Sequence, residues 1–157
     1  MDLTPNKNFL QPTGFCVIIE RAFGNLKFFA HTVSHPGATG TAAEMAVPRV
    51  QRLPLPPDTI NYGELTVSLI LDEDLECYKE VLNWLEGITY GTKETTHHDI
   101  QVIILTSHNN SNVTIKYKDC IPTQVGNIEL TSTAGDLTYL NFDATFRFTE
   151  YELVSNE

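Results

Sequence analysis

The sequence predicts a mainly β fold, an antiparallel β-sandwich or barrel of about seven or eight strands that carries one α-helix. Several runs alternate apolar and polar residues with a period of two, which is typical of strands with one buried face. Turn residues separate most of these runs, and one stretch has the period of an amphipathic helix. The 157 residues suit a single domain spanning 1–157.

The first half of the chain predicts a hairpin, a long loop and a strand. Residues 1–12 have the composition of a polar N-terminal arm. Residues 13–33 contain two apolar runs on either side of AFGN, so we expect a hairpin there. Residues 34–63 hold five of the eight prolines, which predicts a long loop with short strands at most. Residues 64–71 alternate cleanly and predict a strand.

The stretch LDEDLECYKEVLNWLEGI (71–88) is ambiguous, because clustered carboxylates form metal sites, acid–base pairs or helix starts. On a helical wheel over about 73–88, apolar residues including Trp84 fill one half and charged residues the other. Asp72 has the position of an N-cap and Gly87 that of a stop. The carboxylates lie away from the apolar face, so we interpret them as a solvated face or a docking surface for a basic partner. The residues of this surface are Glu73, Glu76, Glu80 and Asn83.

The second half of the chain predicts further strands joined by turns. Residues 99–107 and 113–118 flank the turn HNNSN. Residues 120–133 lead to the turn AGD, and residues 138–149 predict a long strand. One face of that strand is apolar and the other is polar. The apolar residues are Leu140, Phe142, Ala144, Phe146 and Phe148, and the polar ones are Asn141, Asp143, Thr145 and Arg147.

The charge balance argues against one class of function. The chain has 20 acidic and 10 basic residues, a formal net charge of -10. Sequence-tolerant DNA or RNA binders gain affinity by neutralising phosphates, so we do not expect such a protein. The excess of acid suits a surface past which nucleic acid slides, or a contact with a basic protein. No apolar run approaches the ~20 residues of a membrane-spanning helix, and the N-terminus lacks a signal-peptide pattern.

Other candidate sites for chemistry are weak. The histidines of THHD, His97 and His98, point to opposite sides of an extended chain, and no spacing completes a metal site with His108. The segment GATGTAAE lacks the lysine of a phosphate-binding loop. The odd number and wide spacing of the cysteines predict buried, reduced thiols. We therefore predict no metal, no cofactor and no enzymatic activity. The cysteines are Cys16, Cys77 and Cys120.

Two stretches resemble the tail tube proteins of T4-like contractile phages, a family related to tube proteins of type VI secretion and other contractile injection systems. Residues 53–88 are similar to the family's segment of loop, strand, acidic turn and helix with a tryptophan. Residues 117–153 resemble its C-terminal pattern, in which an aliphatic–Pro–Thr element precedes a short strand, a turn and a long aromatic strand. The opening NFLQPTGFCVIIER matches the family's first strand more loosely.

The resemblance implies a subunit of a hexameric ring in which strands from six chains close one barrel. Stacked rings would form the inner tube of a contractile tail, and genomic DNA would pass through the lumen without specific binding. The implied partners are other copies of the chain, the tail sheath protein, and the baseplate or hub and tail terminator proteins, with no membrane. The implied location is the virion, after synthesis in the host cytoplasm.

The resemblance also assigns contact surfaces. The loop at 34–63 would contact neighbouring subunits and the next ring, and the acidic helix surface would meet the sheath. Two alternatives remain open: a tube-like baseplate or adaptor ring that starts or caps the tube, and a monomeric β binding module. The expected inter-ring residues are Pro36, Gly37, Met45, Pro48, Arg49 and Arg52.

Overall fold

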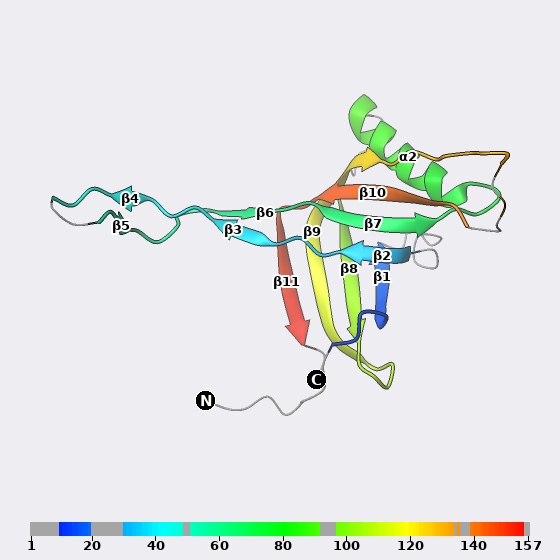
Figure 1. Ribbon diagram of the computed structural model, residues 1–157. Coiled ribbons are helices and arrows are strands. Elements are labelled where there is room, and N and C mark those ends of the chain that lie inside the picture. Colours follow the sequence, from blue (N-terminus) through cyan, green and yellow to red (C-terminus); the bar gives the residue numbers. More distant parts are fainter. Residues whose placement is uncertain are drawn as a thin grey trace.

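The computed structural model describes residues 10–19, 30–48, 51–91, 97–133, 135 and 139–155. Within these residues the chain forms eleven strands and one helix, which confirms the mainly β class (Figure 1). The elements are β1 (Phe15–Ile19), β2 (Ala30–Ser34), β3 (Ala38–Gly40), β4 (Glu44–Met45), β5 (Leu53–Pro54), β6 (Ile60–Tyr62), β7 (Leu65–Ile70), α2 (Glu76–Tyr90), β8 (His98–Leu105), β9 (Ser111–Val125), β10 (Asn141–Arg147) and β11 (Glu150–Ser155).

Seven strands form one antiparallel sheet that divides into two parts around the long strand β9. We call the parts the β8 sheet (β1, β8, the first part of β9, and β11) and the β10 sheet (the last part of β9, β10, β7 and β2). β9 passes between them near Asp119, whose backbone is left-handed with a φ of 53°. The Asp119 amide donates to Asp99 Oδ1 at 3.1 Å, which stabilises this bend.

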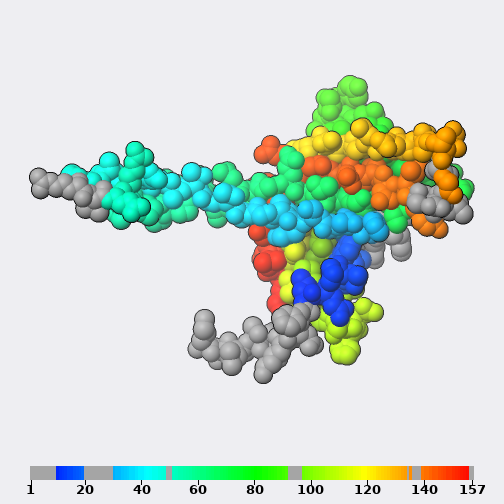
Figure 2. All heavy atoms as spheres, in the orientation of Figure 1, coloured from blue at the N-terminus to red at the C-terminus, as the bar shows by residue number. Residues whose placement is uncertain are grey.

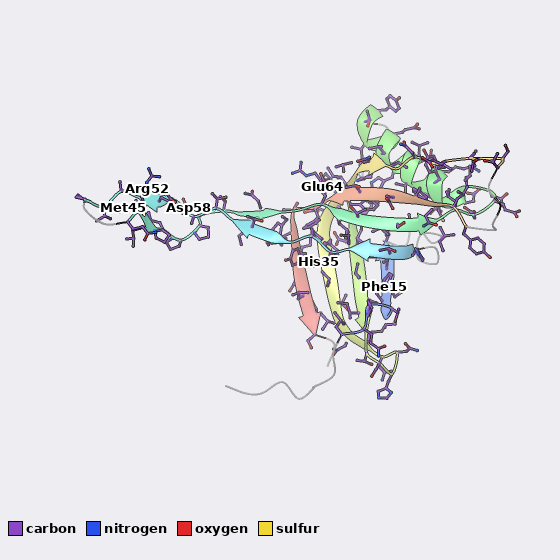
Figure 3. All side chains as sticks on the ribbon, viewed as in Figure 1. Phe15, His35, Met45, Arg52, Asp58 and Glu64 are labelled. Carbon is purple, nitrogen blue, oxygen red and sulfur yellow. The ribbon has the colours of Figure 1, made fainter. Side chains whose placement is uncertain are left out.

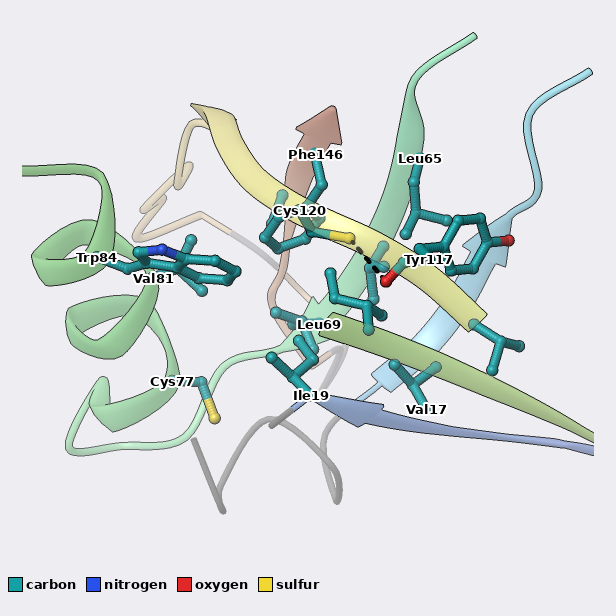
Figure 4. Close-up of a cluster of buried hydrophobic side chains, with 14 of the residues drawn as sticks. Val17, Ile19, Leu65, Leu69, Cys77, Val81, Trp84, Tyr117, Cys120 and Phe146 are labelled. Atoms are coloured by element: carbon teal, nitrogen blue, oxygen red, sulfur yellow. Dashed lines mark hydrogen bonds between the residues drawn. The ribbon is translucent and has the colours of Figure 1, made fainter. Parts of the chain in front are cut away.

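One apolar core lies between the two sheets and the helix (Figure 4). The centre of the core is formed by β7 and β10. Every second residue of these strands points inward and is buried, and the inward residues of the two strands lie opposite one another. Trp84 of α2 is 1% exposed and packs against Phe146, with ring centroids 5.6 Å apart. The opposed pairs are Phe142 with Leu69, Ala144 with Val67, and Phe146 with Leu65.

Helix α2 is displaced along the sequence from its predicted range of 73–88. Leu75 has a left-handed backbone with a φ of 54°, so the helix begins only at Glu76. Asp72 is therefore not the N-cap, although its Oδ2 accepts a hydrogen bond from the Glu76 amide at 3.3 Å. Gly87 is not the stop; it lies buried inside the helix. The helix ends at Gly91, whose φ of 63° is a conformation that glycine adopts without strain.

The predicted apolar face of the helix is confirmed. Its buried residues face the core at intervals of three and four, and the other residues of this face are half-buried. Tyr78 packs edge-on against Phe142 with ring centroids 5.3 Å apart, so the helix lies against the core side of the β10 sheet. The buried residues of α2 are Cys77, Val81, Trp84 and Gly87.

The described residues of 34–63 form a projecting arm with short strands, which the prediction of a long loop allowed (Figures 1 and 2). Two short antiparallel ribbons build it, β3 with β6 near the body and β4 with β5 farther out. Proline-rich connections interrupt the pairing, which explains why the sequence resembles a loop. Met45, Leu53 and Ile60 are more than half exposed, because no other element of the described chain covers the arm.

One prediction of strand pairing is wrong. In its described residues the segment 13–33 does not pair as a hairpin: β1 pairs with β8, β2 pairs with β7, and the two lie at opposite ends of the strand order. The predicted turn residues Gly24 and Asn25 lie outside the described residues. The strand expected at 113–118 is longer than predicted, because β9 runs from Ser111 to Val125. The strand β11, which follows β10, was not expected.

Candidate interaction surfaces

The β10 sheet has one covered and one open face. The helix and the β8 sheet contribute to a single core on its covered side. On the other side, the residues of β7 and β10 that alternate with the buried ones are exposed or half-buried. This face carries hydroxyl and amide groups with one acid and one base. Its polar residues are Thr66, Ser68, Asn141, Asp143, Thr145 and Arg147.

The β10 sheet also has two open edges. Among the described residues, β2 pairs only with β7, and the segment of β9 from Ile121 to Val125 pairs only with β10. All neighbouring pairs in the order β9, β10, β7, β2 are antiparallel, so the two outer strands run in opposite directions. A second copy in the same orientation would therefore bring its β9 beside β2 in antiparallel register. Open edges of this kind are templates for pairing with another chain.

The base of the arm is tightly packed. Pro36 is buried, and Gly63 lies so close to it that a Cβ at position 63 would be 3.1 Å from the Pro36 Cβ. The Gly63 amide donates to the Gly37 carbonyl at 3.0 Å and joins the two arm strands where they leave the body. Of the expected inter-ring residues, Pro36 and Gly37 thus have structural roles at the base.

The outer part of the arm presents an exposed surface (Figure 3). Met45 is 53% exposed, and Pro48 is also exposed. Arg52 forms an ion pair with Glu44 across the β4–β5 ribbon, with 2.9 Å between Nη1 and Oε2. Arg49 lies outside the described residues. The arm therefore offers apolar and charged side chains together, as contact surfaces between proteins do.

The acidic helix surface is smaller than the wheel predicts. Glu73 is exposed but lies in the turn before the helix, while Glu76, Glu80 and Asn83 share one side of α2. Glu76 and Asn83 are exposed, and Glu80 is half-buried with one carboxylate oxygen out of contact with solvent. Lys79 Nζ lies 3.2 Å from Glu76 Oε1 and offsets part of the negative charge. The carboxylates do not converge on a pocket.

An aromatic cluster, which the sequence analysis missed, joins the arm to the body. His35 Nδ1 and the Tyr117 hydroxyl are 2.6 Å apart, and the His35 ring packs edge-on against Tyr151 with centroids 4.8 Å apart. Tyr62, from the other arm strand, packs against Tyr151 at 5.1 Å and Phe148 at 5.7 Å. These five residues come from distant parts of the sequence, so no local pattern reveals the cluster.

Two of the three thiols are buried and only weakly acidic. Cys77 and Cys120 are buried and Cys16 is half-buried, and all three are free, so the expectation of buried thiols holds for two of them. Burial, with Asp72 and Glu80 nearby, raises the pKa of Cys77 to about 11. Burial raises the pKa of Cys120 to about 12. Both groups are therefore protonated and poorly nucleophilic near neutral pH.

The described part of the chain contains neither a cluster of metal-binding side chains nor a membrane-spanning helix. No three side chains of the types that bind metal ions lie close enough together there to share an ion. In the same residues, no helix has the length and apolar character needed to cross a membrane.

Comparison with known proteins finds similarity of fold without similarity of sequence. No protein-family model and no curated protein matches the chain. A chain in the sheath-tube complex of the extracellular contractile injection system PVC superposes with a TM-score of 0.72 at 12% identity, covering 96% of this chain and 94% of the other. A chain of the cap that terminates the anti-feeding prophage (AFP) tube gives 0.72 at 14% identity, covering 99% and 100%. A chain of the AFP baseplate gives 0.67 at 11% identity, covering 89% and 90%.

These similarities establish the fold over nearly the whole length of the chain. The structural neighbours come from the tubes, caps and baseplates of contractile injection systems, in agreement with the fold that the family resemblance implies.

Proposed function

We propose that this chain is a structural subunit of a contractile injection particle, whose copies join edge to edge into a hexameric ring. The observation that carries the proposal is the β10 sheet, with open edges of opposite direction and an open polar face. Repeated pairing of β2 with β9 of the next copy is a head-to-tail contact, which generates a closed ring if the rotation closes. A closed barrel leaves no edge strand exposed.

In this arrangement the open face of the β10 sheet lines the lumen. The hydroxyl and amide groups of this face are hydrated. Within β7 and β10 the face has two charged residues, Asp143 and Arg147, of opposite sign, so its net charge is near zero. The acidic excess is elsewhere, with six carboxylates between Asp72 and Glu86. DNA would then slide without adhesion because the described residues of the wall form no basic patch, and an acid-rich wall is not needed.

Stacking of rings through the arms gives a tube, and the finer role we propose is the inner tube of a contractile phage tail that conducts DNA. The arm supports this role, because its exposed Met45, Leu53 and Ile60 need a partner surface to leave water. The proposed partners are further copies of this chain, the sheath, and the baseplate and terminator proteins. The role is structural, without catalysis, and the location is the virion.

Cysteine cross-linking tests the edge pairing. Thr32→Cys in β2 and Thr123→Cys in β9 place one thiol on each open edge. On mild oxidation of assembled material, the double variant should give a ladder of covalent multimers, whereas each single variant should stay monomeric on a denaturing gel. Assemblies of the double variant that give no ladder would contradict the proposed edges.

Electron microscopy of assembled particles tests the role. Density for this chain should form sixfold rings around the particle axis, and density off the axis would rule out the tube. A ring-forming baseplate or adaptor protein is the second candidate, favoured by the match to a chain of the AFP baseplate. Copy number separates the two, because a tube contains many stacked rings and an initiator contributes one.

The helix surface of Glu73, Glu76, Glu80 and Asn83 is our proposed sheath contact. Reversal of Glu73 and Glu76 to lysine should weaken co-sedimentation of assembled tubes with sheath protein and leave the circular dichroism spectrum unchanged. We leave Glu80 intact in this variant because it is half-buried. Normal sheath binding by the doubly reversed protein would contradict the contact. Glu86→Lys, on an exposed position of the same helix, is the matched control.

A further inference from the structure

The arm is attached to the body by two chain segments and one aromatic cluster. The two segments, 35–37 and 63–64, are short, and Pro36 of the first packs closely against Gly63 of the second. A single backbone hydrogen bond, between the Gly63 amide and the Gly37 carbonyl, ties them together. That bond keeps the two arm strands side by side, but it does not fix the direction of the arm relative to the sheets. Side-chain contacts at the base must do so.

The cluster supplies those contacts from both arm strands. His35, at the arm's entry, contacts Tyr117 of β9 and Tyr151 of β11, and Tyr62, at its exit, contacts Tyr151 and Phe148. Figure 3 places His35 where the arm meets the body. The Tyr117 ring is fully buried in the core, so its hydroxyl is a fixed anchor point. The direction of the arm therefore depends on the contacts of Tyr62 and on the place of His35 beside that hydroxyl.

A cavity adjoins His35 on the side of the body. Its volume is about 370 Å³, and among its lining residues are His31, Val33, His35, Ile115 and Tyr117. The remaining lining residues come from β1, β2, β8 and the segment before β1, and they carry no charge. The cavity gives the imidazole room to leave Tyr117 and gives water a route to the cluster.

His35 is the member of the cluster that changes charge near neutral pH. His35 is exposed on one side, and the partial desolvation of its ring lowers its pKa below the ordinary value of 6.5, which favours the neutral ring. Burial raises the pKa of Tyr117 well above its usual range. The groups in contact with His35 are Tyr117 and Tyr151. His31 also lines the cavity, and no carboxylate lines it to compensate a charged imidazole.

We propose that His35 is a pH-sensitive joint: the neutral ring fixes the arm against the body, and uptake of a proton releases the arm while the sheets stay folded. The sign follows from linkage. The pKa of the imidazole is lower when the arm is packed against the body than when the arm is released. The packed state is therefore fully stabilised above the pKa of the released state. This stabilisation is lost as the pH falls through the lower pKa of the packed state. The fraction of molecules whose arm is held in a fixed direction, and so can bind a partner without further ordering, would then depend on pH. This holds whichever particle the chain belongs to.

The distance between two spin labels, one on the arm and one on the helix, tests the joint. Asp58→Cys and Asn83→Cys provide exposed attachment points in a Cys16→Ala background, since the other two thiols are buried. Between pH 8 and pH 5 the distance distribution should change from narrow to broad, with a midpoint below 6.5. The far-UV circular dichroism spectrum should stay constant over the same range.

Three variants make the test specific. His35→Phe and His35→Gln remove the titration, so their distributions should have the same width at both ends of the pH range. His31→Phe is the matched control, a histidine of the neighbouring strand that lines the same cavity, and it should behave as the parent protein does. The proposal is overturned by a parent distribution that keeps its width, by broadening that persists in both His35 variants, or by loss of the dichroism signal along with the broadening.

Discussion

Truncation of Trp84 to alanine tests the account of the core directly. The side chain is 1% exposed and is enclosed by Phe146, at a ring distance of 5.6 Å, and His98, at 5.0 Å. Removal of a buried indole loses its transfer free energy and leaves a cavity, so we expect the free energy of unfolding to fall by about 3–5 kcal/mol. For a domain of this size, each kcal/mol corresponds to roughly 2–4 °C, so Tm should fall by about 6–20 °C.

The assay is thermal and urea unfolding of the monomer, followed by far-UV circular dichroism because Trp84 is the chain's sole tryptophan fluorophore. The urea midpoint should fall while the slope m stays the same, since the surface exposed on unfolding changes little. Trp84→Phe is the matched control: it keeps an aromatic ring in the site and should lose roughly half as much stability. A Tm of Trp84→Ala within about 2 °C of the parent would refute the burial of this side chain.

Two further predictions concern the sheet connection and the thiols. Gly126→Ala should lower the free energy of unfolding by about 1–3 kcal/mol, because the new Cβ would lie 2.8 Å from the Asp143 carbonyl oxygen, a backbone atom that cannot move aside. An unchanged urea midpoint would contradict this close contact. In a thiol-labelling assay at pH 8, Cys16 should react first, and Cys77 and Cys120 should react only on unfolding, because burial raises their pKa values to about 11 and about 12; rapid labelling of all three would contradict their burial.

Local patterns in the sequence predicted those features that local physics determines. The alternation around Phe142, Ala144 and Phe146 identified the buried face of β10 correctly, since a strand with one buried face must alternate. The same holds for the apolar face of α2. The helix start was misplaced because Leu75 has a left-handed backbone conformation, which few non-glycine residues favour and no propensity predicts.

Non-local pairing was beyond the reach of those patterns. β1 pairs with β8, more than eighty residues away, so two adjacent apolar runs with a turn between them resembled a hairpin that does not form. The arm resembled a loop because its strands are two or three residues long. The cluster at its base depends on residues from 35 to 151 that only the fold brings together. The acidic surface was identified in outline, but not the partial burial of Glu80.

The continuity of β9 through the bend at Asp119 has a mechanical consequence. Fifteen residues of unbroken backbone belong first to the β8 sheet and then to the β10 sheet. A force on one sheet along this strand reaches the other through covalent bonds, and not only through side-chain packing. Sliding of the two sheets past each other along this strand would require many ladder hydrogen bonds to break together. The core of such a subunit would therefore resist shear as a single stiff element, a property suited to a part that is driven forward under load.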